Sequence, residues 1–253
     1  MASDPQSHEA GDDWDSHWQR YADVASLNPA QRFRHSTMIR LLAASRTMAH
    51  ARLLDVGSGQ GDFLVQAAAR WPECRLCGFE MSATGVAITR RKLPSSEAYS
   101  VDLFHPGPEA RPFLGWATHA VCSEVLEHVD EPAKFLAAAA QYMAPGGIMI
   151  VTVPGGPMSS FDRHIGHRQH FTPHLLKQVF SAAGFRSPQA WGAGFPFFNL
   201  YRMAVISRGD KLADEAVTMP WTGKLAMGLF DLLFRIPVPR TPWGWQIVGM
   251  ASK

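Results

Sequence analysis

A short stretch near residue 55 combines a bare backbone with two carboxylates. Residues 53–63 read LLDVGSGQGDF, so that an apolar run contains Asp55, glycine then occupies every second position, and a second acid, Asp62, follows. Glycine lets the backbone turn sharply and lets a ligand approach the main chain more closely than a side chain would allow. A loop of this kind between a strand and a helix is typical of a cofactor-binding site.

Asp62 distinguishes this loop from one that binds a dinucleotide. The dinucleotide pattern G-x-G-x-x-G would place its third glycine at position 62 and a pyrophosphate at the helix N-terminus. A carboxylate there repels a pyrophosphate and suits a ligand with a positive charge. In a second interpretation, Asp62 is an ordinary first-turn acid that stabilises the helix N-terminus. The first interpretation disfavours a nicotinamide oxidoreductase, which is kept as an alternative.

Two further acids follow the next apolar runs. Glu80 stands 25 residues after Asp55, where a carboxylate can accept hydrogen bonds from both hydroxyls of a ribose. Asp102 follows in AYSVDLF, where it can accept a hydrogen bond from an exocyclic amine such as that of adenine. The implied ligand has a ribose, an adenine and a cationic end, but no phosphate.

Together these residues resemble the class I S-adenosylmethionine-dependent methyltransferases of the small-molecule type, similar to the ubiquinone-biosynthesis-like methyltransferases. The matching segments are LLDVGSGQGDF, CGFEMS with Glu80, SVDLF with Asp102, SEVLEHVDEP and LLKQVFSAAGF, and they cover residues 50–186. The resemblance implies S-adenosylmethionine as cofactor, with its amino-acid part at Asp55 and the loop. The residues expected to contact it are Asp55, Gly57, Ser58, Gly59, Gly61, Asp62, Phe63, Glu80, Met81, Asp102, Leu103 and Ser123.

The segment SEVLEHVDEP indicates which acceptor the site serves. Methyltransferases that act on the amines of nucleobases or amides carry Asn or Asp followed by Pro-Pro and an aromatic residue at this place, and that pattern is missing. A hydroxyl acceptor needs a base or a metal, whereas a neutral amine needs less help. We therefore predict methylation on oxygen, with His128 and His167 as catalytic residues, because an imidazole has a pKa near neutrality. Alternatively, His128 only orients its loop.

A metal-dependent alternative stays open. Glu124, Glu127 and His128 form E-x-x-E-H, and His167 lies in DRHIGHRQHFTP. Small-RNA 2′-O-methyltransferases look similar at these places and hold a divalent metal with two Glu and two His, and ubiquinone-pathway O-methyltransferases show a related E-x-x-E-H. Such mixed ligation suits Mg, Mn or Zn. The pair E-H at this strand end also occurs in metal-free relatives, so the metal remains an alternative.

The elements that must position these residues alternate between short apolar runs and helical stretches. Strands are expected at 52–56, 75–79, 98–101, 119–123, 147–153 and 245–251. This alternation is typical of a parallel sheet covered on both faces. One intervening helix has a clear start at Thr172 and Pro173 and a clear end at Gly184. We predict an α/β, doubly wound, seven-stranded Rossmann-like methyltransferase sheet with an N-terminal helical cap and a helical insertion before the last strand.

The chain length fits one domain with additions. We expect a disordered tail over 1–12 and a single methyltransferase domain over 13–253. Within this domain we distinguish a helical cap (13–48), a cofactor-binding core (50–194), an apolar helical insertion (195–240) and a last strand (241–253). Trp14, Trp18 and Tyr21 of the cap either close over the cofactor or acceptor, or pack in the core.

The insertion is the most apolar part of the chain. Residues 222–236 read TGKLAMGLFDLLFRI, which leaves a very broad apolar face on a helix. This face either packs inside the protein, roofs the pocket of an apolar or lipid-like small-molecule acceptor, or makes peripheral contact with a membrane. A non-catalytic S-adenosylmethionine-binding or membrane-docking module is the alternative outside the enzymes.

Composition narrows the partners and the location. The 24 basic and 22 acidic residues give a net charge of +2 without a basic stripe, so no nucleic-acid partner is expected. Cys74, Cys77 and Cys122 are predicted to be reduced, buried thiols, which fits a reducing compartment. The acidic N-terminus is unlike a secretory signal, and no apolar run approaches the ~20 residues of a membrane span. A cytoplasmic location is expected, with peripheral membrane contact as an option.

Overall fold

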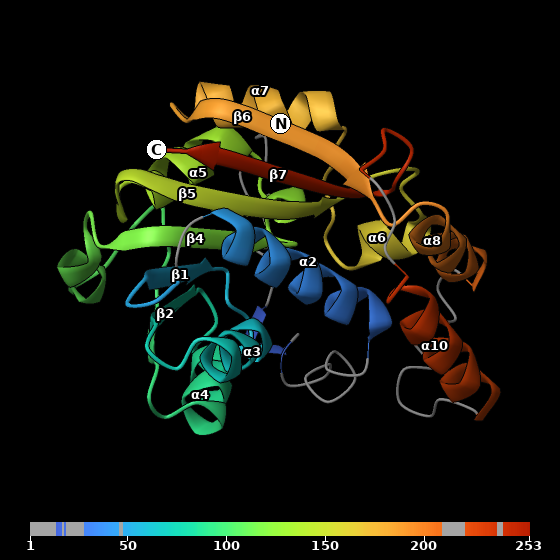
Figure 1. Cartoon of the computed structure of the whole chain (residues 1–253), viewed down its shortest axis with the longest axis horizontal. Helices are drawn as coiled ribbons and strands as arrows, with labels where there is room; N and C mark the ends of the chain where they lie inside the picture. The colour runs from blue at the N-terminus through green and yellow to red at the C-terminus, as the bar shows by residue number, and fades with distance from the viewer. Residues whose placement is uncertain (1–13, 17, 19–27, 46–47, 209–220, 237–239) are drawn as a thin grey trace, which may run out of the picture.

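The computed structural model describes residues 14–16, 18, 28–45, 48–208, 221–236 and 240–253. A seven-stranded sheet forms its centre, in the order β3-β2-β1-β4-β5-β7-β6 (Figure 1). The strands are β1 (Arg52–Val56), β2 (Arg75–Glu80), β3 (Glu97–Ser100), β4 (Ala117–Ser123), β5 (Met143–Pro154), β6 (Arg186–Ala193) and β7 (Gln246–Ser252). Strands β1 to β5 pair in parallel, whereas β7 runs antiparallel between β5 and β6. Because β1 pairs with both β2 and β4, the strand order reverses at β1, and a ligand is expected beyond the carboxyl ends of these strands.

The predicted doubly wound α/β sheet is confirmed, and six of its strands overlap the predicted runs. The seventh strand, β6, was not indicated by the sequence because only Gly192 of its eight residues is buried. It lies at the edge of the sheet, where it pairs with β7 and forms one isolated bridge with Thr241. An edge strand that is largely solvated lacks the apolar run that marks a central strand.

Helices cover both faces of the sheet. They are α2 (Pro29–Ser45), α3 (Asp62–Arg70), α4 (Ala83–Lys92), α5 (Pro132–Ala140), α6 (Ser160–His164), α7 (Pro173–Ala182), α8 (Phe197–Arg208) and α10 (Trp221–Leu233), with 3₁₀ turns at Pro108–Phe113 and Leu126–His128. The predicted start of α7 is confirmed, because the Thr172 hydroxyl accepts a hydrogen bond of 3.1 Å from the Leu175 amide. Its predicted end is confirmed too, since Gly184 adopts φ 85° just after the helix.

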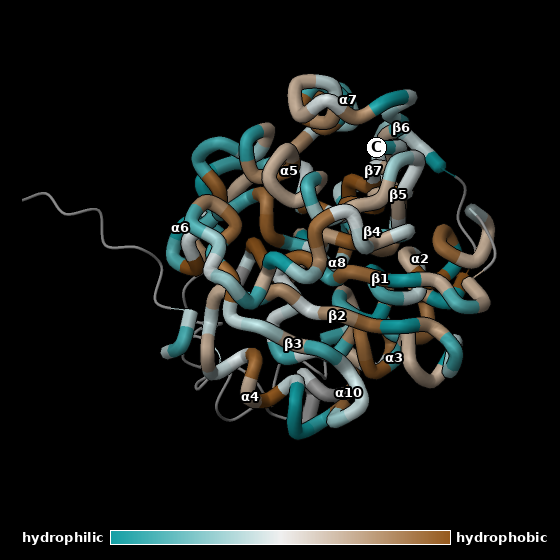
Figure 2. The backbone as a smooth tube through the Cα atoms, turned by 90° about the vertical axis from the view of Figure 1, so that its left-hand side faces the viewer, coloured by the Kyte–Doolittle hydropathy of each residue, from teal (hydrophilic) through white to brown (hydrophobic). Residues whose placement is uncertain are grey.

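Successive residues of the central strands point to opposite faces of the sheet and enter two different cores. Leu53 packs with α2 and α3 through residues such as Leu42. Leu54 packs on the other face with α5 and α7, through Leu136 and Leu176. Figure 2 shows hydrophobic stretches among these layers and hydrophilic stretches mainly at the outer turns. Burial on both faces explains why these strands read as short continuous apolar runs.

The described parts of the insertion form helices α8 and α10, as predicted, and both contact α2. Phe198 of α8 and Phe234, just beyond α10, form a buried cluster with Phe33 of α2. The Arg32 Nε atom of α2 also lies 2.7 Å from an Asp231 carboxylate oxygen of α10. The cap and the insertion, which are far apart in sequence, therefore form one wall beside the carboxyl ends of the strands (Figure 1).

Part of the predicted N-terminal cap lies outside the described residues. Residues 13, 17, 19–27, which include Tyr21, and 46–47 belong to that part, and the predicted tail (1–12) also lies outside the described residues. Helix α2 confirms helical structure within 13–48. Three buried, free thiols confirm the prediction for Cys74, Cys77 and Cys122. In the described part of the chain, we find no helix with the length and apolar character needed to cross a bilayer.

Candidate active site

A cavity of about 930 Å³ opens beyond the carboxyl ends of β1, β2 and β4, and α2, α8 and α10 wall its other side. All the predicted cofactor-contacting residues except Gly61 line this cavity, and His128 and His167 line it as well. The residues that the sequence predicted as one site therefore line one cavity in the structure. The cavity also contains residues of α2, α8 and α10, so the insertion does take part in the site.

The two glycines at 59 and 61 serve different purposes. Gly59 has φ 55°, and a Cβ atom there would lie 2.6 Å from the Trp18 ring, so this position has no room for a side chain. Gly61 has φ 77°, and a Cβ atom there would lie 2.6 Å from Thr89 of α4. Gly61 therefore lets α3 begin close to α4. Because Gly61 faces α4, it does not line the cavity.

Glu80 is held rigidly at the end of β2. Its two carboxylate oxygens accept hydrogen bonds from the backbone amides of Gly59, at 2.7 Å, and of Ser82, at 2.9 Å. Only 7% of Glu80 is exposed, and this burial raises the pKa of its carboxyl even though these hydrogen bonds and one from Trp18 act in the opposite direction. A ligand hydroxyl that reaches Glu80 would share the carboxylate oxygens with these donors.

Asp55 lies beside Glu80 and is also buried. Burial, together with the charge of Glu80, raises the pKa of Asp55 to about 8. At neutral pH this carboxyl is therefore mostly protonated in the protein without a ligand. A cation placed next to the two acids would favour their charged forms, so the pair is suited to a ligand with a positive charge.

The other two acids of the cofactor half already have partners. Asp62 accepts hydrogen bonds from Lys92 at 2.6 Å, from Gln60 at 2.8 Å and from Gln31 at 3.0 Å. The Lys92 ammonium already neutralises the charge of Asp62. This favours the interpretation of Asp62 as a first-turn acid over the interpretation that it binds a cationic ligand. Asp102 accepts from the Phe104 amide at 2.9 Å and lies 3.0 Å from His105 Nδ1.

Two imidazoles and a buried carboxyl gather at the other end of the cavity, after β4. The rings of His128 and His167 meet edge to face with centroids 4.8 Å apart, and Trp14 meets His128 at the same separation. Glu127 is fully buried, and among the described residues its two carboxyl oxygens have no hydrogen-bond partner. Burial, reinforced by the charge of Glu124, raises its pKa well above the usual range. Ligand-type atoms of Glu127, His128 and His167 lie within 4.8 Å of one another.

Glu124 lines the same cavity, but its carboxylate has partners of its own. It has φ 55°, an unusual backbone conformation for a residue other than glycine. Its carboxylate accepts a hydrogen bond of 3.0 Å from Gln246 Nε2 of β7, and its second oxygen lies 3.5 Å from Arg34 of α2. Of the four candidate metal ligands, the structure thus brings together Glu127, His128 and His167, while Glu124 is engaged elsewhere.

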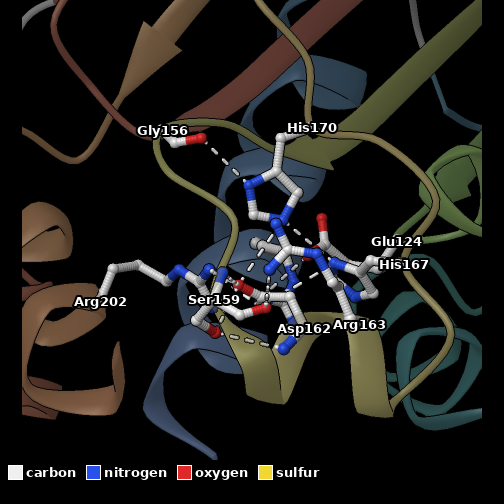
Figure 3. Close-up of polar contacts among 9 residues, drawn as sticks. Glu124, Gly156, Ser159, Asp162, Arg163, His167, His170 and Arg202 are labelled. Atoms are coloured by element: carbon white, nitrogen blue, oxygen red, sulfur yellow. Dashed lines mark hydrogen bonds and ion pairs between the residues drawn. The ribbon is translucent and has the colours of Figure 1, made fainter. Parts of the chain in front are cut away.

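A second cluster, which the sequence reasoning missed, contacts His167 through Asp162 and His170 (Figure 3). Asp162 is fully buried and accepts hydrogen bonds from the Ser159 amide and hydroxyl, both at 2.8 Å, and from Arg202 Nη2 at 2.9 Å. Although burial raises it, these hydrogen bonds bring the pKa of Asp162 down to about 2. The spacing of Ser159 and Asp162 is that of a capping box, which was the one available signal. Arg202 and His170 carried no signal, because their partners are set by the fold.

Comparisons with known proteins agree with this geometry. The sequence model of the family described as "Methyltransferase domain" matches residues 30–189, which is more than half of the chain. Trans-aconitate 2-methyltransferase of Methylobacterium nodulans is 28% identical over 71% of this chain and 67% of its own length. Ubiquinone biosynthesis O-methyltransferase of Aromatoleum aromaticum is 34% identical over 40% of this chain, and the match spans only 42% of that relative.

A solved structure shares the fold. The phosphoethanolamine N-methyltransferase 2 of Haemonchus contortus, in complex with S-adenosyl-L-methionine, superposes with a TM-score of 0.58 at 12% identity. The superposition covers 86% of this chain and 52% of that one.

Proposed function

The chain belongs to the methyltransferase-domain family, and from that premise we propose that it uses S-adenosylmethionine to methylate a hydroxyl oxygen of a small, mainly apolar molecule. The observation that carries this proposal is that Glu80, at one end, and the imidazoles of His128 and His167, at the other, line the same cavity. One end has acids suited to a nucleoside with a cationic group, and the other has bases suited to a hydroxyl.

The residues of the cofactor half fit S-adenosylmethionine. Glu80 would accept hydrogen bonds from the ribose hydroxyls, Asp102 from the adenine amine, and Asp55 would hold the ammonium of the amino-acid part. The absence of a side chain at Gly59 leaves room for the Trp18 ring, which lines the same cavity. When bound, the cofactor supplies an electrophilic methyl group on a positively charged sulfur.

The acceptor half supplies bases and apolar walls. His128 and His167 can accept a hydroxyl proton, and Met227 and Phe230 of α10 line the same cavity together with Phe161. Apolar walls with few polar groups favour an acceptor that is itself largely apolar. The relative from Aromatoleum aromaticum is named as an O-methyltransferase, which supports oxygen as the acceptor atom.

The outer side of the insertion supports peripheral contact with a membrane, which is part of this proposal. Its exposed apolar residues recur at helical spacing and include Leu225, Leu229, Leu232 and Ile236. The inner side of α10 lines the cavity, so only this helix would separate the bilayer from the site of a lipid-like acceptor.

The proposal is tested with methyl-labelled S-adenosylmethionine and a cell extract separated into polar and apolar fractions. We expect a labelled product in the apolar fraction, with the methyl group on oxygen by mass spectrometry, and no product from Glu80→Ala. A methyl group on nitrogen or carbon would reject the oxygen acceptor. Tight cofactor binding without a labelled product in any fraction would favour the non-catalytic binding module.

A further inference from the structure

Three groups form a continuous hydrogen-bonded chain behind His167. The Nδ1 atom of His170 lies 3.1 Å from the carbonyl oxygen of Gly156, and the Nε2 atom of His170 lies 3.1 Å from the Nδ1 atom of His167 (Figure 3). His167 lines the cavity, whereas His170 and Gly156 do not. The chain therefore leads from the backbone to a ring that faces the acceptor.

The direction of each hydrogen bond follows from the chemistry of its partners. A carbonyl oxygen only accepts, so the proton of neutral His170 lies on Nδ1 and its Nε2 has a lone pair. That lone pair accepts a hydrogen bond from the Nδ1–H of His167. Neutral His167 then has no proton on Nε2. The side chains of His167 and His170 are only 8% and 6% exposed, and such burial favours the neutral form of each ring.

We propose that His170 is a positioning residue that fixes His167 in the tautomer whose Nε2 carries a bare lone pair. Since Nδ1 of His167 is engaged by His170, an acceptor in the cavity can meet only Nε2. This inference rests on the proposed oxygen acceptor, and it states which nitrogen of His167 meets that acceptor. The opposite tautomer would present an N–H to the hydroxyl and could not take its proton.

The surroundings of the two rings keep this arrangement in place. The amide of His167 donates to the Asp162 carbonyl at 2.9 Å, and the next amide, of Arg168, donates to the Glu127 carbonyl at 2.7 Å. Gly156, whose carbonyl ends the chain, has φ 73° and lies so close to the Trp245 ring that a Cβ atom would be 2.6 Å from it. The acceptor of the last hydrogen bond is thus fixed by the fold.

The neighbours of His167 affect how well its ring holds a proton taken from the acceptor hydroxyl. A carboxylate oxygen of Asp162 lies 3.9 Å from His167 Nδ1, and the other lies 3.8 Å from His170 Nε2. Burial and the charges of His128, His170 and Arg202 disfavour a positive His167 ring, whereas the contact with Asp162 favours it. In the transfer, the acceptor oxygen forms a bond to the methyl carbon, the carbon–sulfur bond breaks with its electron pair on sulfur, and the hydroxyl proton moves to Nε2 of His167.

Two substitutions at the same position separate positioning from simple packing. In His170→Gln the side-chain amide can donate to the Gly156 carbonyl and accept from His167 Nδ1, so we expect kcat to fall by less than about tenfold. In His170→Phe the ring remains but both hydrogen bonds are lost, and we expect kcat to fall by about 10²-fold or more. The affinity for S-adenosylmethionine, which binds at the other end of the cavity, should not change in either variant. His174→Phe, at an exposed position on α7, is the matched control.

A measurement without any acceptor tests the tautomer itself. In protein labelled with ¹⁵N at histidine, we expect the His167 signals of a ring protonated on Nδ1 and bare on Nε2, and we expect His170→Phe but not His170→Gln to change them. An Nε2-protonated His167 in the unsubstituted protein would overturn the inference, and so would equal kcat values for His170→Phe and the unsubstituted protein. The expected tautomer together with no transfer to any hydroxyl would reject the proposed function instead.

Discussion

Glu124 and Gln246 are 122 positions apart in the chain, yet Gln246 Nε2 donates a hydrogen bond of 3.0 Å to the Glu124 carboxylate. The contact ties the loop after β4 to the start of β7. It engages Glu124 but not Glu127, although a sequence pattern alone would assign both glutamates of E-x-x-E-H to the same ion.

The first prediction concerns chelation. Because Glu124 is bound by Gln246 and Arg34, the four-residue metal set is incomplete, and we expect methyl transfer to be unchanged by EDTA. The rate is measured with labelled S-adenosylmethionine before and after dialysis against the chelator. The metal-dependent alternative would be correct if EDTA removed the activity and added Mg²⁺ restored it. In that case Mg²⁺ should fail to restore the activity of Glu127→Gln.

The sequence identified most residues that line the cavity near Glu80, but it missed the contacts around His167. Asp55, Glu80 and Asp102 follow successive parallel strands, and parallel strands bring their carboxyl ends to one edge, so the spacing along the chain translates directly into proximity. Arg202 reaches Asp162 from α8, a helix whose position depends on its packing against α2. No local pattern encodes such a contact, and the same holds for Gly156 and His170.

The second prediction is that Glu80 is required for cofactor binding. Glu80→Ala removes the acceptor of the Gly59 and Ser82 amides as well as the proposed ribose contact, so we expect the affinity for S-adenosylmethionine to fall by about 10²-fold or more. Calorimetric titration measures this, with Glu73→Ala at an exposed position as the control. Affinity that stays within about twofold of the unsubstituted protein would mean that the glycine loop has been misinterpreted.

The third prediction uses the raised pKa of Asp55. With a pKa of about 8 in the folded protein and near 3.8 in the unfolded chain, the folded state holds an extra proton between these values. The stability that comes from this proton is complete below the unfolded pKa and is lost as the pH rises through about 8. Asp55→Asn has no such proton to lose. In urea unfolding of the ligand-free protein, the free energy of unfolding of the variant should therefore rise relative to that of the unsubstituted chain between pH 5 and 8. Parallel pH profiles for the two proteins would contradict this.

The fourth prediction compares two aspartates that each pair with an arginine. Asp162→Ala leaves the Arg202 guanidinium, on a side chain only 12% exposed, without its carboxylate, and we expect the free energy of unfolding to fall by about 3–5 kcal/mol. Asp130→Ala removes an exposed partner of Arg168, where the expected loss is below about 1 kcal/mol. Denaturant unfolding of both variants measures the difference. Equal losses would show that Arg202 finds another partner when Asp162 is removed.

The last prediction addresses the exposed face of α10. Leu229 and Leu232 are 56% and 61% exposed, while Met227 and Phe230 of the same helix line the cavity. We expect the protein to sediment with vesicles of anionic phospholipid, and Leu229→Ser with Leu232→Ser to abolish this without changing the affinity for S-adenosylmethionine. Leu114→Ser, at a position 55% exposed in the loop before β4, controls for loss of any surface leucine. Should the double variant sediment as well as the unsubstituted protein, the face would not be the membrane contact. Should it lose activity toward an acceptor dissolved in detergent too, α10 would act on the pocket and not on the bilayer, because detergent removes the need to dock.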